Sequence, residues 1–150
     1  MAQTLVNLLV HLVFSTKNRQ PLIRREIEQE LFAYMAGILK KLDSAGLAIN
    51  GTSDHVHLLI TQSKNVALSR LVAELKRSSS KWIKTKGPEF RGFDWQDGYG
   101  AFSIGQSNAE ALKDYITHQK ERHKTRSFQE ELLDILRKYH VAYDERYIWT

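Results

Sequence analysis

Asp54-His55-Val56-His57-Leu58-Leu59-Ile60 is the stretch that decides the fold of this 150-residue chain. Its apolar run is typical of a buried strand, and successive side chains of a strand point to opposite faces of the sheet. His55 and His57 therefore share one face, while Val56 points the other way. Two imidazoles held side by side form half of a metal site, although a His-hydrophobic-His triplet is more often structural.

Outward from this strand, the spacing of apolar residues alternates between strand and helix periods. The predicted elements are a strand over 5–14, which we expect to be central, a helix over 24–42, a hairpin that joins 47–49 to 55–60, a helix over 68–82 and a strand over 99–104. This order predicts an α+β, ferredoxin-like βαββαβ fold, with a four-stranded antiparallel sheet and two helices on one face.

Two further helices are predicted after this core, which spans about residues 4–104. Capping-box pairs, Ser107 with Glu110 and Ser127 with Glu130, precede helical patterns at about 108–123 and from 127. The second helix leads into an aromatic tail that runs to residue 150. We expect one domain over residues 1–150.

Composition narrows the class of protein. Hydrophobic residues make up 42% of the chain, which suits a globular core. The chain has no cysteine, which excludes disulfides and thiolate catalysis and favours a cytoplasmic protein. The longest apolar run, residues 8–13, is too short to cross a bilayer, and we see no secretory signal.

The net charge of +5 is concentrated in part of the chain. Basic residues between 70 and 91 are interleaved with aromatic ones, a pattern that suits phosphate contacts and base stacking. The alternative is a solvated, lysine-rich helix beside core aromatics. The candidate nucleic-acid contacts are Lys17, Arg19, Arg70, Lys76, Arg77, Lys81 and Lys84.

The predicted helix over 108–123 carries a stripe that begins apolar and ends polar, at Tyr115, Gln119 and His123. Residues four apart project in nearly the same direction from a helix. A metal held by His55, His57 and the Gln119 carboxamide would have open positions, which is typical of a catalytic site. Mn²⁺ tolerates imidazole better than Mg²⁺ does.

The Tyr115 hydroxyl beside such a metal is a candidate nucleophile toward a phosphodiester. A helical tyrosine at apolar spacing is more often part of the core. For the remaining histidines near these patterns, His11, His118 and His123, we expect structural roles.

The chain resembles the HUH single-tyrosine transposases of small insertion sequences, and most closely their REP-associated branch. The similarity covers essentially the whole chain. The matching motifs are Ser53-Asp54-His55-Val56-His57-Leu58-Leu59-Ile60, Tyr115-Ile116-Thr117-His118-Gln119, Thr16-Lys17-Asn18-Arg19, Tyr99-Gly100-Ala101-Phe102-Ser103, Ser127-Phe128-Gln129-Glu130-Glu131 and Tyr143-Asp144-Glu145-Arg146-Tyr147-Ile148-Trp149. Arg122 departs from the hairpin-binding relatives, which often carry a second histidine there.

The resemblance implies that His55, His57 and Gln119 bind Mg²⁺ or Mn²⁺ and that Tyr115 is the nucleophile. It implies site-specific cleavage and rejoining of single-stranded DNA beside hairpins, through a 5′-phosphotyrosine. It also implies a homodimer, in some members with Tyr115 and Gln119 serving the partner's histidines.

Two other functions remain open from the residues alone. The first is a non-cleaving module that binds hairpin DNA or RNA, with Tyr115 stacking on a base. The second is a metal-dependent phosphodiesterase that activates water instead of the tyrosine. Replication-initiation and mobilisation nucleases share the His pair, but they arrange their motifs differently along longer chains.

Overall fold

The computed structural model describes residues 1–149, and within that range four strands form one antiparallel sheet. The strands are β1 (Leu9–Ser15), β2 (Ala45–Gly51), β3 (His55–Thr61) and β4 (Gly100–Ile104). Their spatial order is β2-β3-β1-β4, so β1 and β3 are central and paired with each other. The predicted α+β fold and the central position of the first strand are confirmed.

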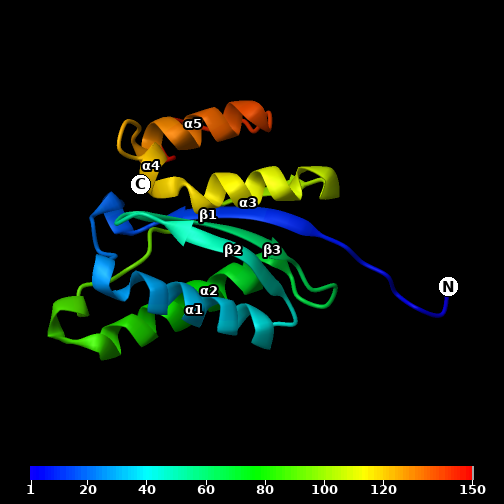
Figure 1. Cartoon of the computed structure of the whole chain (residues 1–150), viewed down its shortest axis with the longest axis horizontal. Coiled ribbons are helices and arrows are strands. Elements are labelled where there is room, and N and C mark those ends of the chain that lie inside the picture. The colour runs from blue at the N-terminus through cyan, green and yellow to red at the C-terminus, as the bar shows by residue number, and fades with distance from the viewer. Residues whose placement is uncertain (150) are drawn as a thin grey trace.

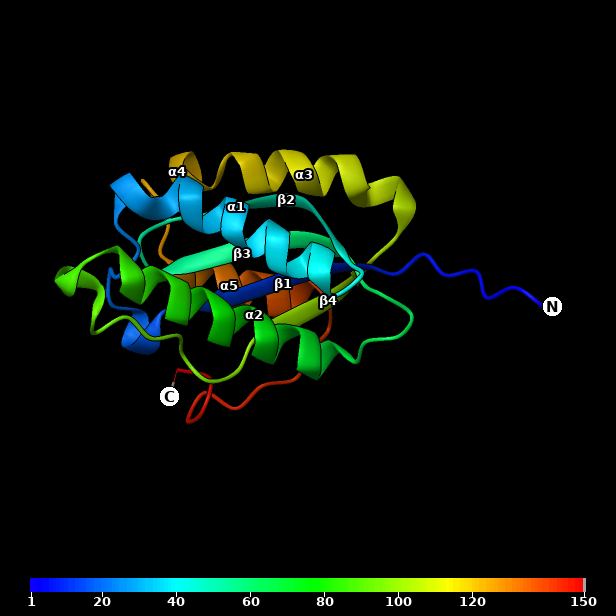
Figure 2. The ribbon, with the colours of Figure 1, turned by 90° about the horizontal axis from the view of Figure 1, so that it is seen from below.

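Helices α1 (Arg25–Lys41) and α2 (Leu68–Ile83) lie together on one face of the sheet, as predicted (Figures 1 and 2). They cover the strand positions that alternate with the histidines, because the period of a strand sends these side chains to one side. The buried apolar side chains on this side include Leu12, Phe14, Leu31, Met35, Leu39, Val56, Leu58, Ile60, Leu71 and Leu75. This face is the main hydrophobic core.

The C-terminal helices cover the opposite face (Figure 1). They are α3 (Ala109–Thr117), α4 (Gln119–Arg122) and α5 (Phe128–Lys138). Two smaller apolar clusters hold them in place, one around Leu59 and Ile116 and the other around Val13 and Phe128. The sheet is therefore the middle layer of three.

One of the two predicted capping boxes is present. The Ser127 side chain accepts a hydrogen bond from the Glu130 backbone N–H at 3.2 Å, so α5 begins as predicted. The Ser107 prediction is wrong, because a 3-10 turn, η4 (Gln106–Asn108), precedes α3 and no side chain caps that helix. The other 3-10 turns are η1 (Lys17–Arg19), η2 (Lys84–Lys86) and η3 (Pro88–Phe90).

The first strand is shorter than predicted. It begins at Leu9, which pairs with Thr61 and with Ile104, the last residues of β3 and β4. Both neighbouring strands end there, so residues 5–8 do not continue the sheet, and Leu5 and Leu8 are exposed on an arm that leaves the domain (Figures 1 and 2). At the other end, residue 150 of the expected tail lies outside the described residues.

The helix predicted over 108–123 is interrupted at His118, where α3 ends and α4 follows. The physical reason lies on the neighbouring strand. The Asn50 side-chain amide of β2 donates hydrogen bonds to the carbonyls of Ile116 and Thr117, both at 3.0 Å. These carbonyls thus find partners outside the helix, and the chain turns before Gln119.

Candidate active site

The histidine pair lies on the sheet face that α3, α4 and α5 cover. His55 and His57 are fully buried on β3, opposite Ser15 and Val13 of β1. The tight turn before His55 depends on Gly51, because a Cβ at that position would collide with the His55 carbonyl oxygen. The hairpin turn therefore fixes the position of His55 at the start of β3.

Each histidine is oriented through its Nδ1 atom. His55 Nδ1 is 2.7 Å from Asp54 Oδ1, a carboxylate that also accepts a bond from the Thr52 hydroxyl. His57 Nδ1 is 2.8 Å from His11 Nε2 on β1. Partners of this kind orient histidines that bind metals. The two Nε2 atoms are left to face the helices above.

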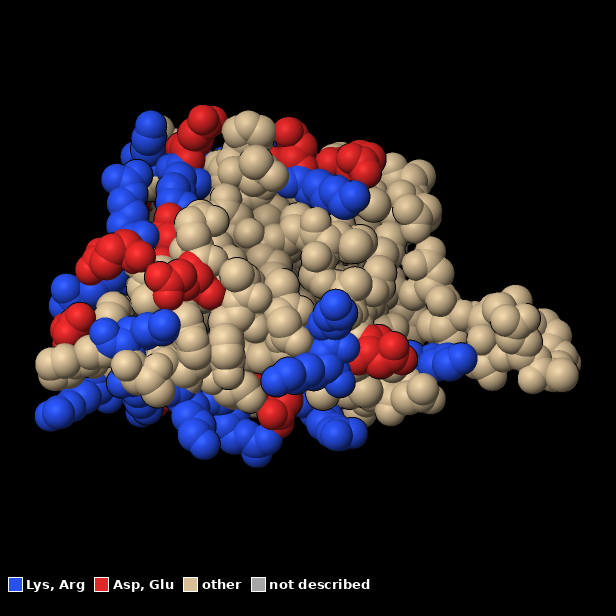
Figure 3. Space-filling model, turned by 60° about the horizontal axis from the view of Figure 1, so that its bottom comes forward, with Lys and Arg blue, Asp and Glu red and all other residues tan. Residues whose placement is uncertain are grey.

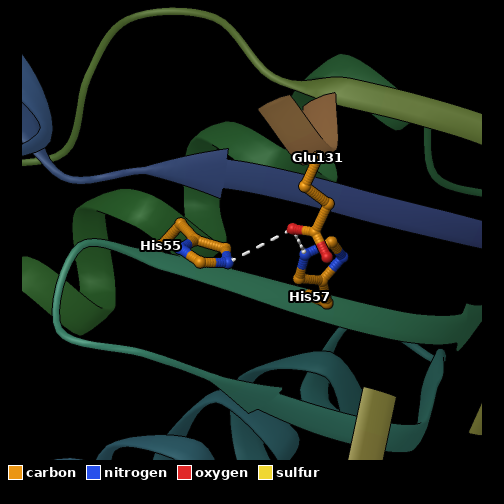
Figure 4. A group of neighbouring side chains, drawn as sticks. All are labelled: His55, His57 and Glu131. Atoms are coloured by element: carbon orange, nitrogen blue, oxygen red, sulfur yellow. Dashed lines mark hydrogen bonds and ion pairs between the residues drawn. The ribbon is translucent and has the colours of Figure 1, made fainter. Parts of the chain in front are cut away.

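Glu131 of α5 brings a carboxylate to these two nitrogens (Figure 4). Its Oε1 atom is 2.8 Å from His57 Nε2 and 3.5 Å from His55 Nε2. The same atom is 3.1 Å from His123 Nε2. Only 3% of Glu131 is exposed, so this is a buried charge surrounded by imidazoles.

The two site residues predicted on the tyrosine helix also reach this carboxylate. The Tyr115 hydroxyl and the Gln119 side-chain amide both donate to Glu131 Oε2, the latter at 3.2 Å. Gln119 is fully buried, and its Oε1 atom is 3.4 Å from His55 Nε2. The structure therefore brings together all four residues predicted for catalysis and metal binding.

Sequence reasoning missed the role of Glu131, although a signal was present. The buried side of α5 is formed by Phe128, Leu132 and Ile135, at the i, i+4 and i+7 positions of an amphipathic helix. Glu131 occupies the i+3 position of that same stripe. A carboxylate among core positions needs a buried partner, and this requirement points to the histidines.

Two of the three histidines expected to be structural belong to the cluster. His11 supports His57, and the His123 ring packs edge-on against His55 with ring centres 4.4 Å apart. The structural role predicted for His11 and His123 stays a prediction, and the structure adds that both lie in this cluster. His118 is exposed and its Nδ1 is 2.7 Å from the Asp114 carbonyl oxygen, in keeping with the prediction.

The electrostatics of the cluster centre on Glu131. Burial opposes its ionisation, but hydrogen bonds from His123, His55 and His57 hold the pKa of Glu131 far below its usual range. Burial lowers the pKa of His57. For His55 burial acts in the same direction, but bonds to Asp54 and Glu131 outweigh it and raise the pKa. The carboxylate is thus ionised and shared among imidazoles.

The Tyr115 hydroxyl holds its proton in this arrangement. Burial, together with the bond to the Glu131 carboxylate, raises the pKa of Tyr115 well above its usual value. The Arg122 guanidinium lies over the tyrosine ring, 4.1 Å from its centre, and acts in the opposite direction. A cation near the hydroxyl is also placed to offset negative charge on a bound phosphate.

The donor atoms suit a divalent metal ion. His55, His57 and Glu131 each offer one ligand atom, and these atoms lie within 4.8 Å of one another. Two imidazole nitrogens and a carboxylate oxygen form a common ligand set, and the partners at Nδ1 leave both Nε2 atoms available. The predicted third ligand, Gln119, stands beside this group with its oxygen toward His55. The cluster is therefore able to bind a metal.

The predicted nucleic-acid contacts lie elsewhere. Most are on α2 or directly after it, across the sheet from the histidines, and Figure 3 shows Lys and Arg gathered along the lower edge of that side. Some have structural partners: Lys76 donates to the Gln96 carbonyl at 2.7 Å, and Arg19 donates to the Trp149 carbonyl at 3.2 Å. The others are Lys17, which pairs with Asp94, Arg77, which pairs with Glu74, and Arg70, Lys81 and Lys84. Their contact with DNA stays a prediction.

The fold and the site together define a class of protein: a ferredoxin-like sheet whose buried histidines and carboxylate could hold a metal beside a tyrosine hydroxyl. The family model described as "Transposase IS200 like" matches residues 4–119, a stretch that includes His55, His57, Tyr115 and Gln119. The chain belongs to this family of transposases, which are DNA-cleaving enzymes.

Two solved structures share the fold. One is a protein from Deinococcus radiodurans R1 assigned as a transposase, with 22% identity, a TM-score of 0.61, and coverage of 77% of this chain and 93% of that one. The other is a REP-associated tyrosine transposase bound to a REP hairpin, with 14% identity, a TM-score of 0.61, and coverage of 81% and 72%. No curated protein was found to match. Among the described residues, every helix is too short or too polar to cross a membrane.

Proposed function

We propose that this transposase cleaves and rejoins single-stranded DNA beside hairpins, with Tyr115 as the nucleophile. One observation carries the proposal: the Tyr115 hydroxyl and the Nε2 atoms of His55 and His57 all meet at the carboxylate of Glu131. A nucleophile and a metal-binding pair that share one buried partner are close enough to act on the same phosphate.

The proposed reaction forms a 5′-phosphotyrosine. The Tyr115 oxygen bonds to phosphorus and gives up its proton, and the bond from phosphorus to the 3′ oxygen breaks, so that one strand end leaves as a 3′ hydroxyl. Rejoining is the reverse: a 3′ hydroxyl attacks the phosphotyrosine and releases Tyr115. The covalent intermediate conserves the phosphodiester, so no nucleotide hydrolysis is needed.

We assign His55, His57 and Gln119 as the ligands of Mg²⁺ or Mn²⁺, with Glu131 as a further oxygen ligand. The metal supplies Lewis-acid assistance at the scissile phosphate. The protein residues do the rest: Asp54 and His11 hold the two imidazoles in orientation, and His55, His57 and Gln119 are themselves fully buried.

We further propose that the substrate carries a hairpin, a proposal supported by the REP hairpin in the structure of the REP-associated tyrosine transposase. The expected homodimer stays a prediction. Within one chain the Tyr115 hydroxyl meets the carboxylate that His57 contacts, which supports a site built from a single chain, and sharing between subunits stays a prediction as well. We expect the enzyme to act on DNA in the cytoplasm of a prokaryotic cell.

The decisive test is a cleavage assay with single-stranded oligonucleotides tiled across both strands of the DNA that flanks the coding region. With Mn²⁺, the wild-type protein should form a covalent adduct that survives denaturing electrophoresis, and mass spectrometry should place it on Tyr115. Tyr115→Phe should form none. Tyr34→Phe is the matched control, because Tyr34 lies on α1 and stacks on Trp82, across the sheet from the site.

The alternatives give different results. A hairpin-binding module would retain the oligonucleotides without cutting them. A water-using phosphodiesterase would leave free 5′-phosphate ends and would keep its activity in Tyr115→Phe. Either outcome would replace the proposed mechanism.

A further inference from the structure

A cavity of about 470 Å³ opens between β4, α3 and α5, next to the proposed nucleophile. Tyr115 and Glu131 form part of its wall, so it is continuous with the catalytic cluster. Its volume lies in the range of sites that bind small molecules. Metal binding and the tyrosine nucleophile explain the side chains of the cluster, but neither requires a cavity next to it.

The charges around the cavity favour an anion. Arg122, Arg126 and Lys138 line it, and Asp134, which also lines it, is ion-paired with Arg126. The Glu131 carboxylate is hydrogen-bonded to His57 and His123. The remaining positive charge, from Arg122 and Lys138, is placed to meet a phosphate group.

The wall also offers an aromatic surface. Tyr139, at the end of α5, lines the cavity and stacks on Phe102 of β4, with ring centres 4.9 Å apart and planes inclined by 13°. A half-buried ring fixed by a second ring makes a firm support for a flat ligand. Aromatic side chains of this kind support single-stranded bases through stacking, whatever the base.

His11 adds a polar group that lacks a partner. It lines the cavity, it is 98% buried, and within residues 1–149 its Nδ1 is the one buried side-chain nitrogen or oxygen without a hydrogen bond. The hydrogen bond between His57 Nδ1 and His11 Nε2 is satisfied with His57 as the donor and His11 Nε2 as the acceptor. The neutral His11 ring then carries its own proton on Nδ1, as a donor that no protein group satisfies.

We propose that this cavity binds one nucleotide of the single-stranded DNA, adjacent to the phosphate that Tyr115 attacks. The inference rests on the proposed function and names a subsite for it. The base lies against Tyr139 with a carbonyl or ring nitrogen toward His11 Nδ1, and the backbone phosphate faces Arg122 and Lys138. Each nucleobase carries such acceptors, and the base must be unpaired to enter, which fits a single-stranded substrate.

The test is an NMR titration of the full-length, isotope-labelled protein in Mg²⁺ with the four deoxynucleoside 5′-monophosphates. Binding should shift the amide signals of Ser103, Asn108 and Ala111, which line the cavity, together with the Nδ1 signal of His11. Deoxyribose 5-phosphate and inorganic phosphate, which lack a base, should bind at least about tenfold more weakly, because stacking and one hydrogen bond are lost.

Variants that fill the cavity sharpen the test. Ala111→Trp on α3 should weaken nucleotide binding by about tenfold or more, whereas Glu110→Trp, one residue away and outside the cavity, should not. Asn108→Trp fills the cavity from the turn before α3, so the test does not depend on a single variant that folds. Equal binding of phosphate alone, or unchanged binding in both filled variants, would overturn the proposal.

The two proposals fail in different ways. If the wild-type protein forms the Tyr115 adduct but binds no mononucleotide in this cavity, only the subsite is wrong. If it binds nucleotides here and forms no adduct with any tiled oligonucleotide, the subsite stands and the tyrosine mechanism falls.

Discussion

The two faces of the sheet are built from the same strands but differ in the side chains that they bury. On β1 and β3, residues such as Leu12, Val56 and Leu58 point toward α1 and α2, while His11, His55 and His57 point toward the C-terminal helices. The alternation is a direct result of strand geometry. One side contains the main apolar core, and the other contains a buried polar cluster.

The difference shows how one small sheet combines stability with chemistry. Burial of the apolar side chains stabilises the fold roughly in proportion to the area removed from water. Burial of imidazoles and a carboxylate costs free energy unless each finds a partner. Burial on the apolar face therefore offsets the cost of the polar cluster on the opposite face. Mutations on one face should change stability and mutations on the other should change metal binding.

The largest expected effect comes from the apolar face. Leu58→Ala should lower the free energy of unfolding by about 2–5 kcal/mol, because a fully buried side chain leaves a cavity. Urea denaturation measures the loss, and the exposed Leu47→Ala is the control. Mn²⁺ affinity per folded molecule should stay unchanged. A parallel loss of affinity would show that the two faces do not act separately.

The next largest effect is on the polar face: the free energy of unfolding should depend on pH through the buried His11. Burial, followed by the nearby His57, lowers the pKa of His11 from 6.5 to about 3. Between about pH 3 and pH 6.5, the His11 imidazole is protonated in the unfolded chain but stays neutral in the folded protein. The stability contributed by neutral His11 is therefore complete above pH 6.5 and is lost as the pH falls toward 3.

In metal-free protein, the free energy of unfolding of the wild type should fall more steeply from pH 6 to pH 4 than that of His11→Asn. The expected difference in slope is about 1.4 kcal/mol per pH unit, which corresponds to one proton. His118→Asn removes an exposed histidine and should follow the wild type. Equal slopes in wild type and His11→Asn would mean that His11 takes up its proton in the folded state.

Glu131→Gln should have a smaller effect on stability and a clear effect on metal binding. The variant keeps the shape of the side chain but removes the charge that three imidazoles face. We expect a loss of about 1–3 kcal/mol in metal-free unfolding and a weaker affinity for Mn²⁺ by about 10–100-fold. Calorimetric titration measures the affinity.

Glu130→Gln is the matched control for that change, because Glu130 is the exposed neighbour and its carboxylate meets only surface groups such as Ser127. It should bind Mn²⁺ as the wild type does. If Glu131→Gln binds Mn²⁺ unchanged, the carboxylate orients the histidines without being a ligand, and Gln119 supplies the oxygen by itself.

Local patterns in the sequence were enough to predict most of the fold. The order of elements followed from strand and helix periods, and the placement of His55 with His57 followed from the two-residue period of a strand. Tyr115 and Gln119 were predicted from helical spacing, and the structure places both against the carboxylate that the histidines contact.

The remaining features depend on contacts between distant parts of the chain. Glu131 joins the site only because α5 folds back over β3: its position in the apolar stripe marks it as buried, but its distance from the histidines follows only from the folded chain. The break at His118 depends on Asn50, far away in the sequence. The predicted strand from Leu5 was too long because its partners end at Thr61 and Ile104.

The smallest expected effect concerns the link between the sheet and the tyrosine helix. Asn50 on β2 ties down the end of α3 through two carbonyls, and Lys120 of α4 pairs with Glu28 of α1 at 2.9 Å. Asn50→Ala should lower the free energy of unfolding by only about 1 kcal/mol, because water can reach these part-exposed carbonyls.

The rate of Tyr115 adduct formation should fall more than that modest loss suggests, because Tyr115 and Gln119 lie on either side of the break that Asn50 fixes. Saturating Mn²⁺ should not restore the rate, since the histidine pair is untouched. Asn65→Ala, on the connection between β3 and α2, is the control. A rate unchanged in Asn50→Ala would show that the apolar contacts of Ile116 position the tyrosine without help from the strand.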